Sequence, residues 1–419
     1  MTTDVVVIGL GYVGLPLAQE ASRSGLSVLG FDVNADVVAN LNAGRSHVDD
    51  LSDSEVAEML TQGFRATTDE AEIASADTAV ICVPTPLSED GGPDLGAVIA
   101  ATKTVARQLR PGMLVVLEST TYPGTTDEVV KPLLADAGFE IGTEVCLAFS
   151  PERIDPGNTT FGMKNTPKVV GGTTPRCTER ATSFYERFVD TVVPAKGTRE
   201  AETAKLLENT YRHINIALVN EMARFCHDLG IDLWDVIKMA STKPFGFQAF
   251  YPGPGVGGHC IPIDPNYLSH NVRSRLGYPF RFVELAQEIN ATMPQYVVRR
   301  AQDILNDDAR ALRGAHILLL GVTYKANIAD QRESPAVPLA AQLQRAGAVV
   351  EFHDPKVQTW HLASGDIERV ADLEVAVKDA DLVILVQSHQ SYDLDALSSN
   401  AQRFFDTRGV TSSPEVHRL

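Results

Sequence analysis

The glycine-rich turn near the start of this chain constrains its fold more than any other feature. The turn reads Gly9-x-Gly11-x-x-Gly14, follows a β-branched run that begins at Val5, and leads into a helical pattern. A second apolar run then ends at Asp32. This order of strand, glycine turn, helix, strand and acid predicts a βαβ unit that binds a dinucleotide, with the pyrophosphate at the helix N-terminus. Asp32 would accept the ribose hydroxyls, and no arginine follows it to hold a 2′-phosphate, so the pattern favours NAD over NADP.

Apolar runs and helical patterns continue to alternate up to about residue 197. The runs predict strands at 78–83, 113–117, 145–149, 168–172 and 192–194. Polar motifs at 84–86, 118–124 and 150–153 follow the first three of these runs. Because ligands bind beyond the carboxyl ends of the strands in an open parallel sheet, we expect these motifs to face one crevice.

The pattern changes at Glu200. From there to about Gly230, apolar residues recur at near-helical spacing without proline, which predicts one long helix. Further helical patterns cover 232–240 and 279–305. A helix longer than the globular average commonly links two domains and offers a face to a second copy, so we expect a homodimer through the central helices.

The last part of the chain repeats the first pattern in degenerate form. A strand run at 316–321 ends in glycine, and a helical pattern at 335–346 leads to a strand that ends in Asp354. We therefore predict an α/β fold with two Rossmann-like, doubly wound domains joined by a helical central domain with a long connecting helix. The expected domains are 1–197, 198–307 and 308–419.

Bulk composition argues against several classes of function. The net charge of -18 disfavours nucleic acid and membrane surfaces as partners, since both need a basic footprint. No apolar run approaches the roughly 20 residues of a membrane span, and no basic leader precedes the first strand. The five cysteines are odd in number and scattered without Cys-x-x-Cys spacing, which predicts a cytoplasmic protein without a structural metal.

Cys260 closes a loop that carries four glycines between 253 and 258. Glycine lets the backbone approach a ligand closely and adopt positive φ, so this loop could admit a bulky substrate beside a sulfur. A nucleophilic cysteine would make covalent chemistry possible. A lone cysteine in a tight turn is more often structural, so the catalytic interpretation depends on the rest of the chain.

Taken together, the motifs make the chain resemble the UDP-glucose/GDP-mannose dehydrogenase family over nearly its whole length. They are, in chain order, Gly9-x-Gly-Tyr12-Val13-Gly14-Leu-Pro16, Pro84-Thr85-Pro86, Glu118-Ser-Thr120, Ser150-Pro-Glu152, Ala204-Lys205-Leu-Leu-Glu-Asn209, Gly257-Gly-His-Cys260, and Gly321-x-x-Tyr324-Lys325 with Asp330-x-Arg332-Glu-Ser-Pro335.

The resemblance implies a four-electron oxidation of the C6 hydroxyl of a nucleotide sugar to a carboxylate, with two NAD used in succession. Cys260 would capture the aldehyde as a thiohemiacetal, which a second oxidation turns into a thioester. Lys205 and Asn209 lie four residues apart, hence on one helix face, and would hold the developing oxyanion and the sugar.

The resemblance also implies roles in the release of the acid. Asp264 would order or deprotonate the water, Glu152 is the other candidate base, and Thr120 could orient the water or the C6 oxygen. Which of Asp264 and Glu152 acts as the base is left open. A base must lie within hydrogen-bond reach of the proton that it removes, and a sequence does not show this distance. His259 could activate the thiol, but adjacent residues rarely face each other, so a structural role is favoured.

The family positions also supply two sets of binding residues. Those matched to NAD are Gly9, Gly11, Tyr12, Val13, Gly14, Asp32, Pro84, Thr85, Thr120 and Arg332. Those matched to the nucleotide sugar are Glu152, Arg153, Lys205, Asn209, Tyr251, Gly253, Gly255, Gly257, Tyr324 and Lys325.

The segment Ser150–Asn158 departs from the usual pattern of the UDP-glucose and GDP-mannose enzymes and looks like the N-acetylhexosamine branch. UDP-N-acetylglucosamine is the favoured substrate, with Arg153 and the 154–165 loop as candidate partners of the acetamido group. UDP-N-acetylmannosamine and UDP-glucose are the alternatives. More distant alternatives are a two-electron β-hydroxyacid dehydrogenase and a nucleotide-sugar-binding protein without catalytic activity.

Overall fold

The computed structural model describes residues 3–48, 51–88, 92–155, 158, 160–258 and 261–419. The chain separates into two compact units, one of Met1–Glu208 with Asn266–Tyr278 and one of Asn209–Pro265 with Pro279–Leu419. The first division falls inside the long helix α7 (Thr198–Asp228). The domain boundaries near 197 and 307 remain predictions.

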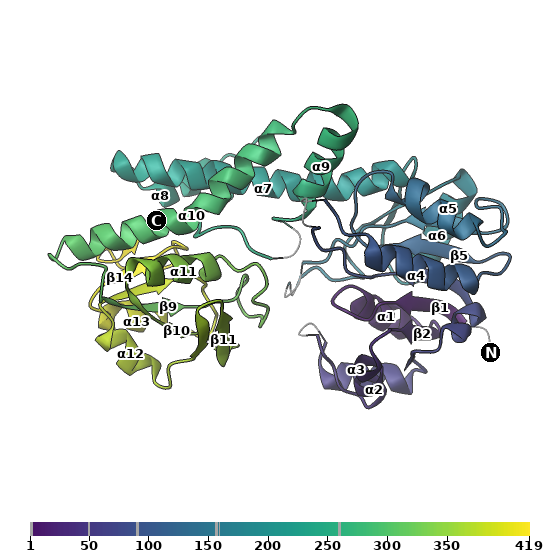
Figure 1. Ribbon diagram of the computed structural model, residues 1–419, viewed down its shortest axis with the longest axis horizontal. Helices are drawn as coiled ribbons and strands as arrows, with labels where there is room; N and C mark the ends of the chain where they lie inside the picture. The colour runs from purple at the N-terminus through teal and green to yellow at the C-terminus, as the bar shows by residue number, and fades with distance from the viewer. Residues whose placement is uncertain (1–2, 49–50, 89–91, 156–157, 159, 259–260) are drawn as a thin grey trace. The chain divides into compact units, whose positions relative to one another are not determined.

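The described residues of the first unit build an eight-stranded sheet (Figure 1). Its strands are β1 (Thr3–Ile8), β2 (Val28–Phe31), β3 (Arg65–Thr67), β4 (Ala76–Ile81), β5 (Leu114–Leu117), β6 (Cys146–Phe149), β7 (Lys168–Gly172) and β8 (Val192–Pro194). The order β3-β2-β1-β4-β5-β6 is that of a dinucleotide-binding sheet, so the crevice beyond the carboxyl ends of β1 and β4 is the expected ligand site.

Strand β7 reverses direction against β6, with Ala148 opposite Gly172 and Phe149 opposite Gly171. Continued outward, this antiparallel register sets residue 168 against residue 152. The start of β7 therefore belongs to the same sheet edge as the loop that follows β6.

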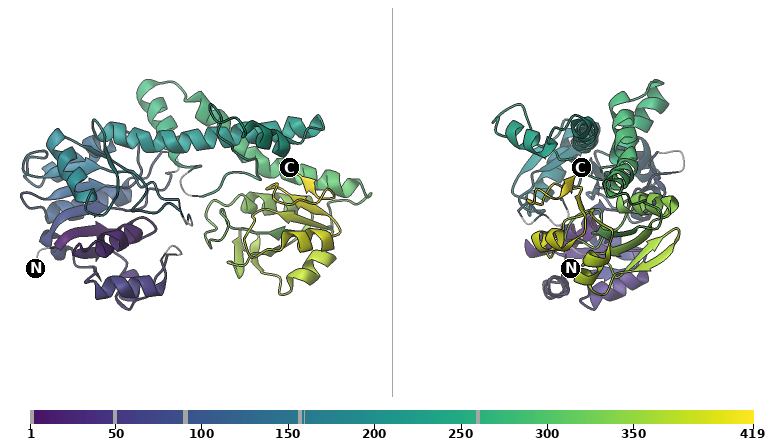
Figure 2. Two further views of the ribbon diagram at one scale, coloured as in Figure 1. Left: turned by 180° about the vertical axis from the view of Figure 1, so that it is seen from behind. Right: turned by 90° about the vertical axis from the view of Figure 1, so that its left-hand side faces the viewer.

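Alternating side chains of the central strands form two cores, one on each face of the sheet, as expected for strands covered on both sides. Helices α1 (Gly14–Arg23), α3 (Asp53–Thr61) and α6 (Pro175–Tyr185) contribute to one core. Helix α4 (Gly96–Arg107) and the segment that includes α5 (Lys131–Ala135) contribute to the other. The left view of Figure 2 shows these elements from behind.

The second unit contains a parallel five-stranded sheet in the order β10-β9-β13-β14-β15. These strands are β9 (His316–Leu320), β10 (Val349–His353), β13 (Leu382–Leu385), β14 (Phe404–Asp406) and β15 (His417–Arg418). Helices α10 (Arg281–Asn306) and α11 (Ala336–Ala346) pack on one face, and α12 (Leu373–Asp379) and α13 (Leu394–Asn400) on the other. The prediction of two doubly wound α/β domains with a helical middle is confirmed.

The remaining helical elements include α2 (Ala35–Asn42), α8 (Leu233–Ala240) and α9 (Asp264–Leu276). Helix α9 and the hairpin of β11 (Thr359–Leu362) and β12 (Gly365–Glu368) were not expected from the sequence. Helix α9 is strongly polar, so it lacks the apolar periodicity that revealed α7 and α10. Across the described part of the chain, we find no helix with the length and apolar character that a membrane crossing needs.

Candidate functional site

The glycine turn after β1 has the shape that a pyrophosphate needs. Gly9 has a φ of 89°, and a Cβ on Gly14 would come within 1.9 Å of the Gly9 carbonyl oxygen. A Cβ on Gly11 would meet no atom within 4 Å, so the space over this residue is open. The turn leads directly into α1, whose N-terminal amides can face an anion. These residues therefore fit a dinucleotide.

Asp32 follows β2 and is tied to the glycine turn. Its Oδ2 accepts the backbone N–H of Leu10 at 2.9 Å, and its Oδ1 accepts that of Asn34 at 2.9 Å. The side chain is only half-buried, and each carboxylate oxygen has a further lone pair. Asp32 can therefore accept ribose hydroxyls while bracing the turn.

The loops after β4 and β5 are joined by hydrogen bonds. Thr85 is buried and donates its hydroxyl to the carbonyl oxygen of Thr120 at 2.8 Å. The Tyr267 hydroxyl donates to the carbonyl oxygen of Thr85, and Ser119 Oγ donates to that of Val83 at 2.7 Å. Two predicted site residues, Thr85 and Thr120, thus lie side by side.

Glu202, a residue that the sequence did not single out, holds the far side of the β5 loop. Its carboxylate accepts the backbone N–H of Gly124 at 2.5 Å and both the N–H and the hydroxyl of Thr126, at 2.9 and 2.7 Å. Burial raises the pKa of Glu202 to about 7 even though these hydrogen bonds oppose the shift. The loop that carries Thr120 is therefore anchored to α7, one turn before Lys205.

Glu152 and Arg153 occupy the loop after β6. Glu152 Oε1 accepts the backbone N–H groups of Arg153 and Ile154, at 2.6 and 2.5 Å. The Arg153 guanidinium lies 2.7 Å from Glu208 and donates to the carbonyl oxygen of Pro167 at 2.6 Å. This arginine, predicted to contact the acetamido group, thus fastens its loop to α7.

Lys205, Asn209 and Asp264 are all buried. Asn209 Nδ2 donates to Asp264 Oδ2 at 2.6 Å, so two predicted catalytic residues meet within the second unit. Asp264 is the first residue of α9, and a carboxylate there is stabilised by the helix N-terminus. Lys205 lies in the first unit, one helical turn before Asn209 on α7.

Cys260 and His259 lie outside the described residues, but the loop before them is described. The backbone N–H of Gly253 donates to Asn220 Oδ1 at 2.9 Å. A Cβ on Gly257 would come within 2.8 Å of Tyr324 Cβ, and one on Gly258 within 2.8 Å of the Tyr324 ring. These glycines thus let the loop approach Tyr324, a predicted nucleotide contact.

The segment after β9 carries the other predicted nucleotide contacts. Gln387 Nε2 donates to the carbonyl oxygen of Tyr324 at 2.9 Å, and the carbonyl oxygen of Lys325 accepts the Thr323 hydroxyl at 2.9 Å. The Arg332 guanidinium lies 2.6 Å from Asp330. The role of Arg332 toward NAD remains a prediction.

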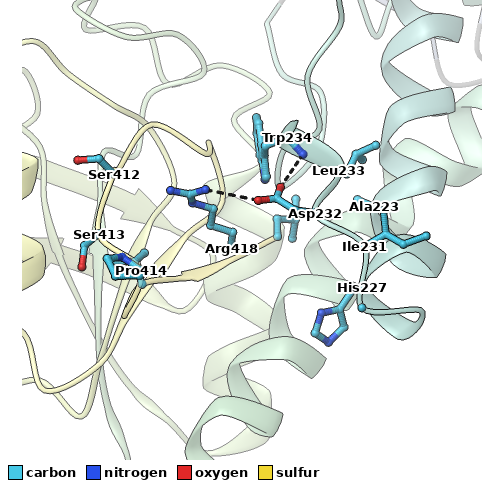
Figure 3. Close-up of a pocket in the computed structure, with 13 residues that line it drawn as sticks. Ala223, His227, Ile231, Asp232, Leu233, Trp234, Ser412, Ser413, Pro414 and Arg418 are labelled. Carbon is cyan, nitrogen blue, oxygen red and sulfur yellow. Dashed lines mark hydrogen bonds and ion pairs between the residues drawn. The ribbon is translucent and has the colours of Figure 1, made fainter. Parts of the chain in front are cut away.

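Figure 3 shows a hollow of about 510 Å³ in the second unit, between the end of α7, the start of α8 and the segment 412–419. The Asp232 carboxylate there lies 3.8 Å from the Arg418 guanidinium and caps α8 by accepting the N–H of Trp234. None of the residues that line this hollow belongs to the predicted site, so we assign the chemistry elsewhere. In the residues that the structure describes, we find no group of three His, Cys, Asp or Glu side chains suited to a metal ion.

Three family models match the chain in succession. All three describe the UDP-glucose/GDP-mannose dehydrogenase family: its NAD binding domain matches residues 3–189, its central domain residues 199–292, and its UDP binding domain residues 318–413. The prediction of NAD as the cofactor and of the family itself is thereby confirmed.

Several curated relatives share about a third of the sequence with this chain. An NDP-N-acetyl-D-galactosaminuronic acid dehydrogenase from Ralstonia nicotianae is 35% identical, with 98% of this chain and 97% of that protein covered. A UDP-N-acetyl-D-glucosamine 6-dehydrogenase from Pseudomonas aeruginosa is 36% identical over 84% of this chain and 83% of its own. The solved structure of a UDP-D-ManNAc dehydrogenase from Pyrococcus horikoshii superposes with a TM-score of 0.90 at 30% identity, covering 100% of this chain and 98% of that one.

Proposed function

This chain belongs to the UDP-glucose/GDP-mannose dehydrogenase family and is an NAD-dependent nucleotide-sugar dehydrogenase, and from that premise we propose that it oxidises the C6 hydroxyl of a UDP-N-acetylhexosamine to the carboxylate. UDP-N-acetylglucosamine is the substrate we favour. The observation that carries the proposal is that relatives spanning most or nearly all of the chain are named for N-acetylated sugars. The Ser150–Asn158 segment supports it, since it departs from the UDP-glucose pattern.

The cofactor would be held by the glycine turn and by Asp32. When bound, NAD accepts a hydride from the sugar carbon, once in each of two rounds. The open space over Gly11 leaves room for the pyrophosphate, and the half-buried Asp32 carboxylate is positioned beside the turn to hold the ribose. Thr85 and Thr120, joined by their hydrogen bond, would close the crevice at the ends of β4 and β5.

Cys260 is the proposed nucleophile. C6 loses a hydride and its hydroxyl a proton to give the aldehyde, and the Cys260 sulfur adds to the carbonyl carbon as a thiohemiacetal. Loss of a second hydride from the carbon and of the hydroxyl proton gives a thioester. Water then attacks the same carbon, the C–S bond breaks, and the sulfur leaves as a thiolate while the carboxylate is released. Covalent retention keeps the aldehyde from diffusing away between the two oxidations.

Asp264 is proposed to orient the attacking water, and Lys205 to stabilise the oxyanion at C6. The Asn209 amide holds the Asp264 carboxylate at 2.6 Å, an arrangement that can orient a water molecule for attack. The buried Lys205 ammonium would stabilise the negative charge that develops on the C6 oxygen. Glu152 is the second candidate base.

The nucleotide would be held by Tyr324 and Lys325. A lysine supplies a counter-charge for a pyrophosphate, which the chain's net charge of -18 does not provide in general. The contact of Gly257 and Gly258 with Tyr324 supports a pocket in which the loop before Cys260 adjoins the nucleotide.

A second copy of the chain would dimerise along α7. Leu207, Leu218 and Phe225 recur at helical spacing on α7, and all three are exposed in the single chain, Leu207 by 64%. Burial of such a stripe against a second copy is favourable. Sedimentation equilibrium should give twice the chain mass, and a monomer at micromolar concentration would contradict this part of the proposal. The cytoplasmic location remains a prediction.

The test of the substrate is a comparison of kcat/KM for UDP-N-acetylglucosamine, UDP-N-acetylmannosamine, UDP-N-acetylgalactosamine, UDP-glucose and GDP-mannose. We expect an N-acetylated UDP-sugar to lead by at least about tenfold, and UDP-glucose as the best substrate would contradict the proposal. A Cys260→Ser variant should lose steady uronate formation while it still binds NAD.

A further inference from the structure

A fully buried lysine stands at the start of β7, next to the proposed site. Lys168 is only 3% exposed, and its Nζ lies 2.9 Å from Glu118 Oε2 and 3.3 Å from Glu152 Oε2. Lysine is almost never buried so completely unless it is paired. Burial would lower the pKa of Lys168, but the two carboxylates outweigh it and leave that pKa raised, so the side chain is an ammonium ion.

The sheet explains how these charges meet. Glu118 directly follows β5, and Glu152 follows β6 by three residues. Because β7 runs antiparallel to β6, its first residue, Lys168, comes to the edge where β5 and β6 end. A parallel β7 would have placed Lys168 at the opposite edge.

Glu118 is held as firmly as the lysine. Its side chain is completely buried, and its Oε1 accepts a hydrogen bond from the Tyr185 hydroxyl on α6. Lys168 Nζ also lies 5.2 Å from the centre of the Tyr185 ring. Lys168 is therefore anchored on its inner side by Glu118 and Tyr185.

Glu152 is the member of the cluster that reaches outward, with its side chain 13% exposed. Its Oε1 is fixed by the backbone N–H groups of Arg153 and Ile154, and its Oε2 by Lys168. A carboxylate fixed through both oxygens has one orientation, which is what a base or a substrate-binding group requires.

We propose that Lys168 is a positioning residue for the Glu152 carboxylate and that its charge balances Glu118 and Glu152 together. The inference deepens the proposed function, because it assumes that Glu152 acts on the substrate or on the attacking water. Without the Lys168 ammonium, Glu118 and Glu152 would be two neighbouring carboxylates in a poorly solvated place, and one of them would take up a proton more readily.

Other groups around the cluster do not replace this charge. Cys82, after β4, stays a neutral thiol because burial raises its pKa well above the usual value. Tyr185 is likewise neutral, since burial raises the pKa of its hydroxyl. The Arg153 guanidinium is paired with Glu208.

The test measures kcat and KM for uronate formation against pH in a set of variants. Lys168→Met should lower kcat at pH 7 by at least about tenfold with little change in the KM for NAD. It should also move the acid limb of the kcat profile to higher pH by about one unit or more. Lys168→Arg should restore most of both.

A double variant separates charge balance from packing. In Lys168→Met/Glu118→Gln the cation and one carboxylate are both removed, so the acid limb should return toward its wild-type position. Lys196→Met, which alters an exposed lysine just after the neighbouring strand β8, is the matched control and should change nothing. Thermal unfolding of each variant reports whether it folds.

An acid limb that stays in place in a folded Lys168→Met enzyme would overturn the inference and leave Lys168 a purely structural residue. If Lys168→Met does not fold, the position of the acid limb of the kcat profile in Lys168→Arg and in the double variant tests the inference. Failure of the proposed function looks different, because the wild-type enzyme would then form no uronate from any N-acetylated UDP-sugar.

Discussion

The two doubly wound domains share a pattern but treat their equivalent aspartates differently. Asp32 follows the second strand of the first domain, is half-buried, and accepts two backbone N–H groups. Asp354 follows the corresponding strand of the second domain and is completely buried. It accepts the N–H groups of Val322 and Lys356 and lies 3.0 Å from His389 Nε2. One aspartate is available to a ligand, while the other is part of the interior.

The turns beside these aspartates differ in the same sense. In the first turn, the space over Gly11 is open. The second turn has a single glycine, Gly321, and a Cβ added there would come within 2.4 Å of the Gln387 carbonyl oxygen. The same chain topology therefore provides a dinucleotide site in one domain and a rigid support for Tyr324 and Lys325 in the other. Four measurements test how the two parts of the chain differ.

The largest effect is expected from Asp354→Ala. This change leaves backbone donors and His389 buried without their acceptor, which should cost about 3–5 kcal/mol of unfolding free energy. Differential scanning calorimetry should show a transition at markedly lower temperature, while the KM for NAD stays within about twofold. A stable Asp354→Ala protein with weakened NAD binding would reverse the assignment of the two aspartates.

The two compact units, each through one group on α7, should also respond to pH in opposite ways. The pKa of Glu202 is raised from 4.5 to about 7 by burial, so the stability that it contributes is present below 4.5 and is lost as pH rises through 7. The pKa of His213 is lowered from 6.5 to about 4 by burial, so its contribution is present above 6.5 and is lost as pH falls through 4. Each amounts to about 3 kcal/mol at most.

Chemical denaturation of Glu202→Gln and His213→Gln against pH measures both terms. The difference from wild type should change between pH 4.5 and 7 for the first variant and between pH 4 and 6.5 for the second. Glu200→Gln, at an exposed position on the same helix, should show no such change. If the difference in unfolding free energy from wild type does not depend on pH in any of the three variants, the raised pKa of Glu202 and the lowered pKa of His213 are contradicted.

A smaller effect is expected from Asp32→Ala. Hydrogen bonds to a charged group contribute about 1.5–3 kcal/mol, so kcat/KM for NAD should fall roughly 10- to 100-fold. The melting temperature should fall by less than in Asp354→Ala, because Asp32 is only half-buried. Unchanged NAD kinetics would mean that the ribose is held elsewhere.

The smallest effect is expected from Lys325→Met. Loss of one counter-charge to the pyrophosphate should raise the KM for the UDP-sugar roughly tenfold, with the KM for NAD unchanged. Lys356→Met alters an exposed lysine of the same unit and is the control. An equal loss in both variants would point to general electrostatics rather than to a contact.

Much of the fold could be predicted because its signals are local. The glycine turn, the apolar runs and the spacing on α7 each lie within a short segment, and the structure places the corresponding elements within a few residues of the expected ranges. The position of Asp32 beside the glycine turn could be predicted for the same reason, since its distance from the turn along the chain is characteristic.

The supporting groups of the site could not be found in this way. Lys168 and Glu118 are 50 residues apart, and Glu202 holds a loop 76 to 78 residues away. The contacts between these residues depend on the strand order and on the reversed direction of β7, which no local sequence pattern indicates. A signal did exist, because a lysine at the start of an apolar strand and a glutamate directly after one are charged residues at positions where burial is expected.

The most direct test of the central claim is the amount of NADH formed per UDP-N-acetylglucosamine consumed in a single, complete reaction of the purified enzyme. A four-electron oxidation through a thioester predicts a ratio close to two, with the uronate as the product. A ratio close to one, with an aldehyde or ketone as the product, would contradict it and favour a two-electron dehydrogenase.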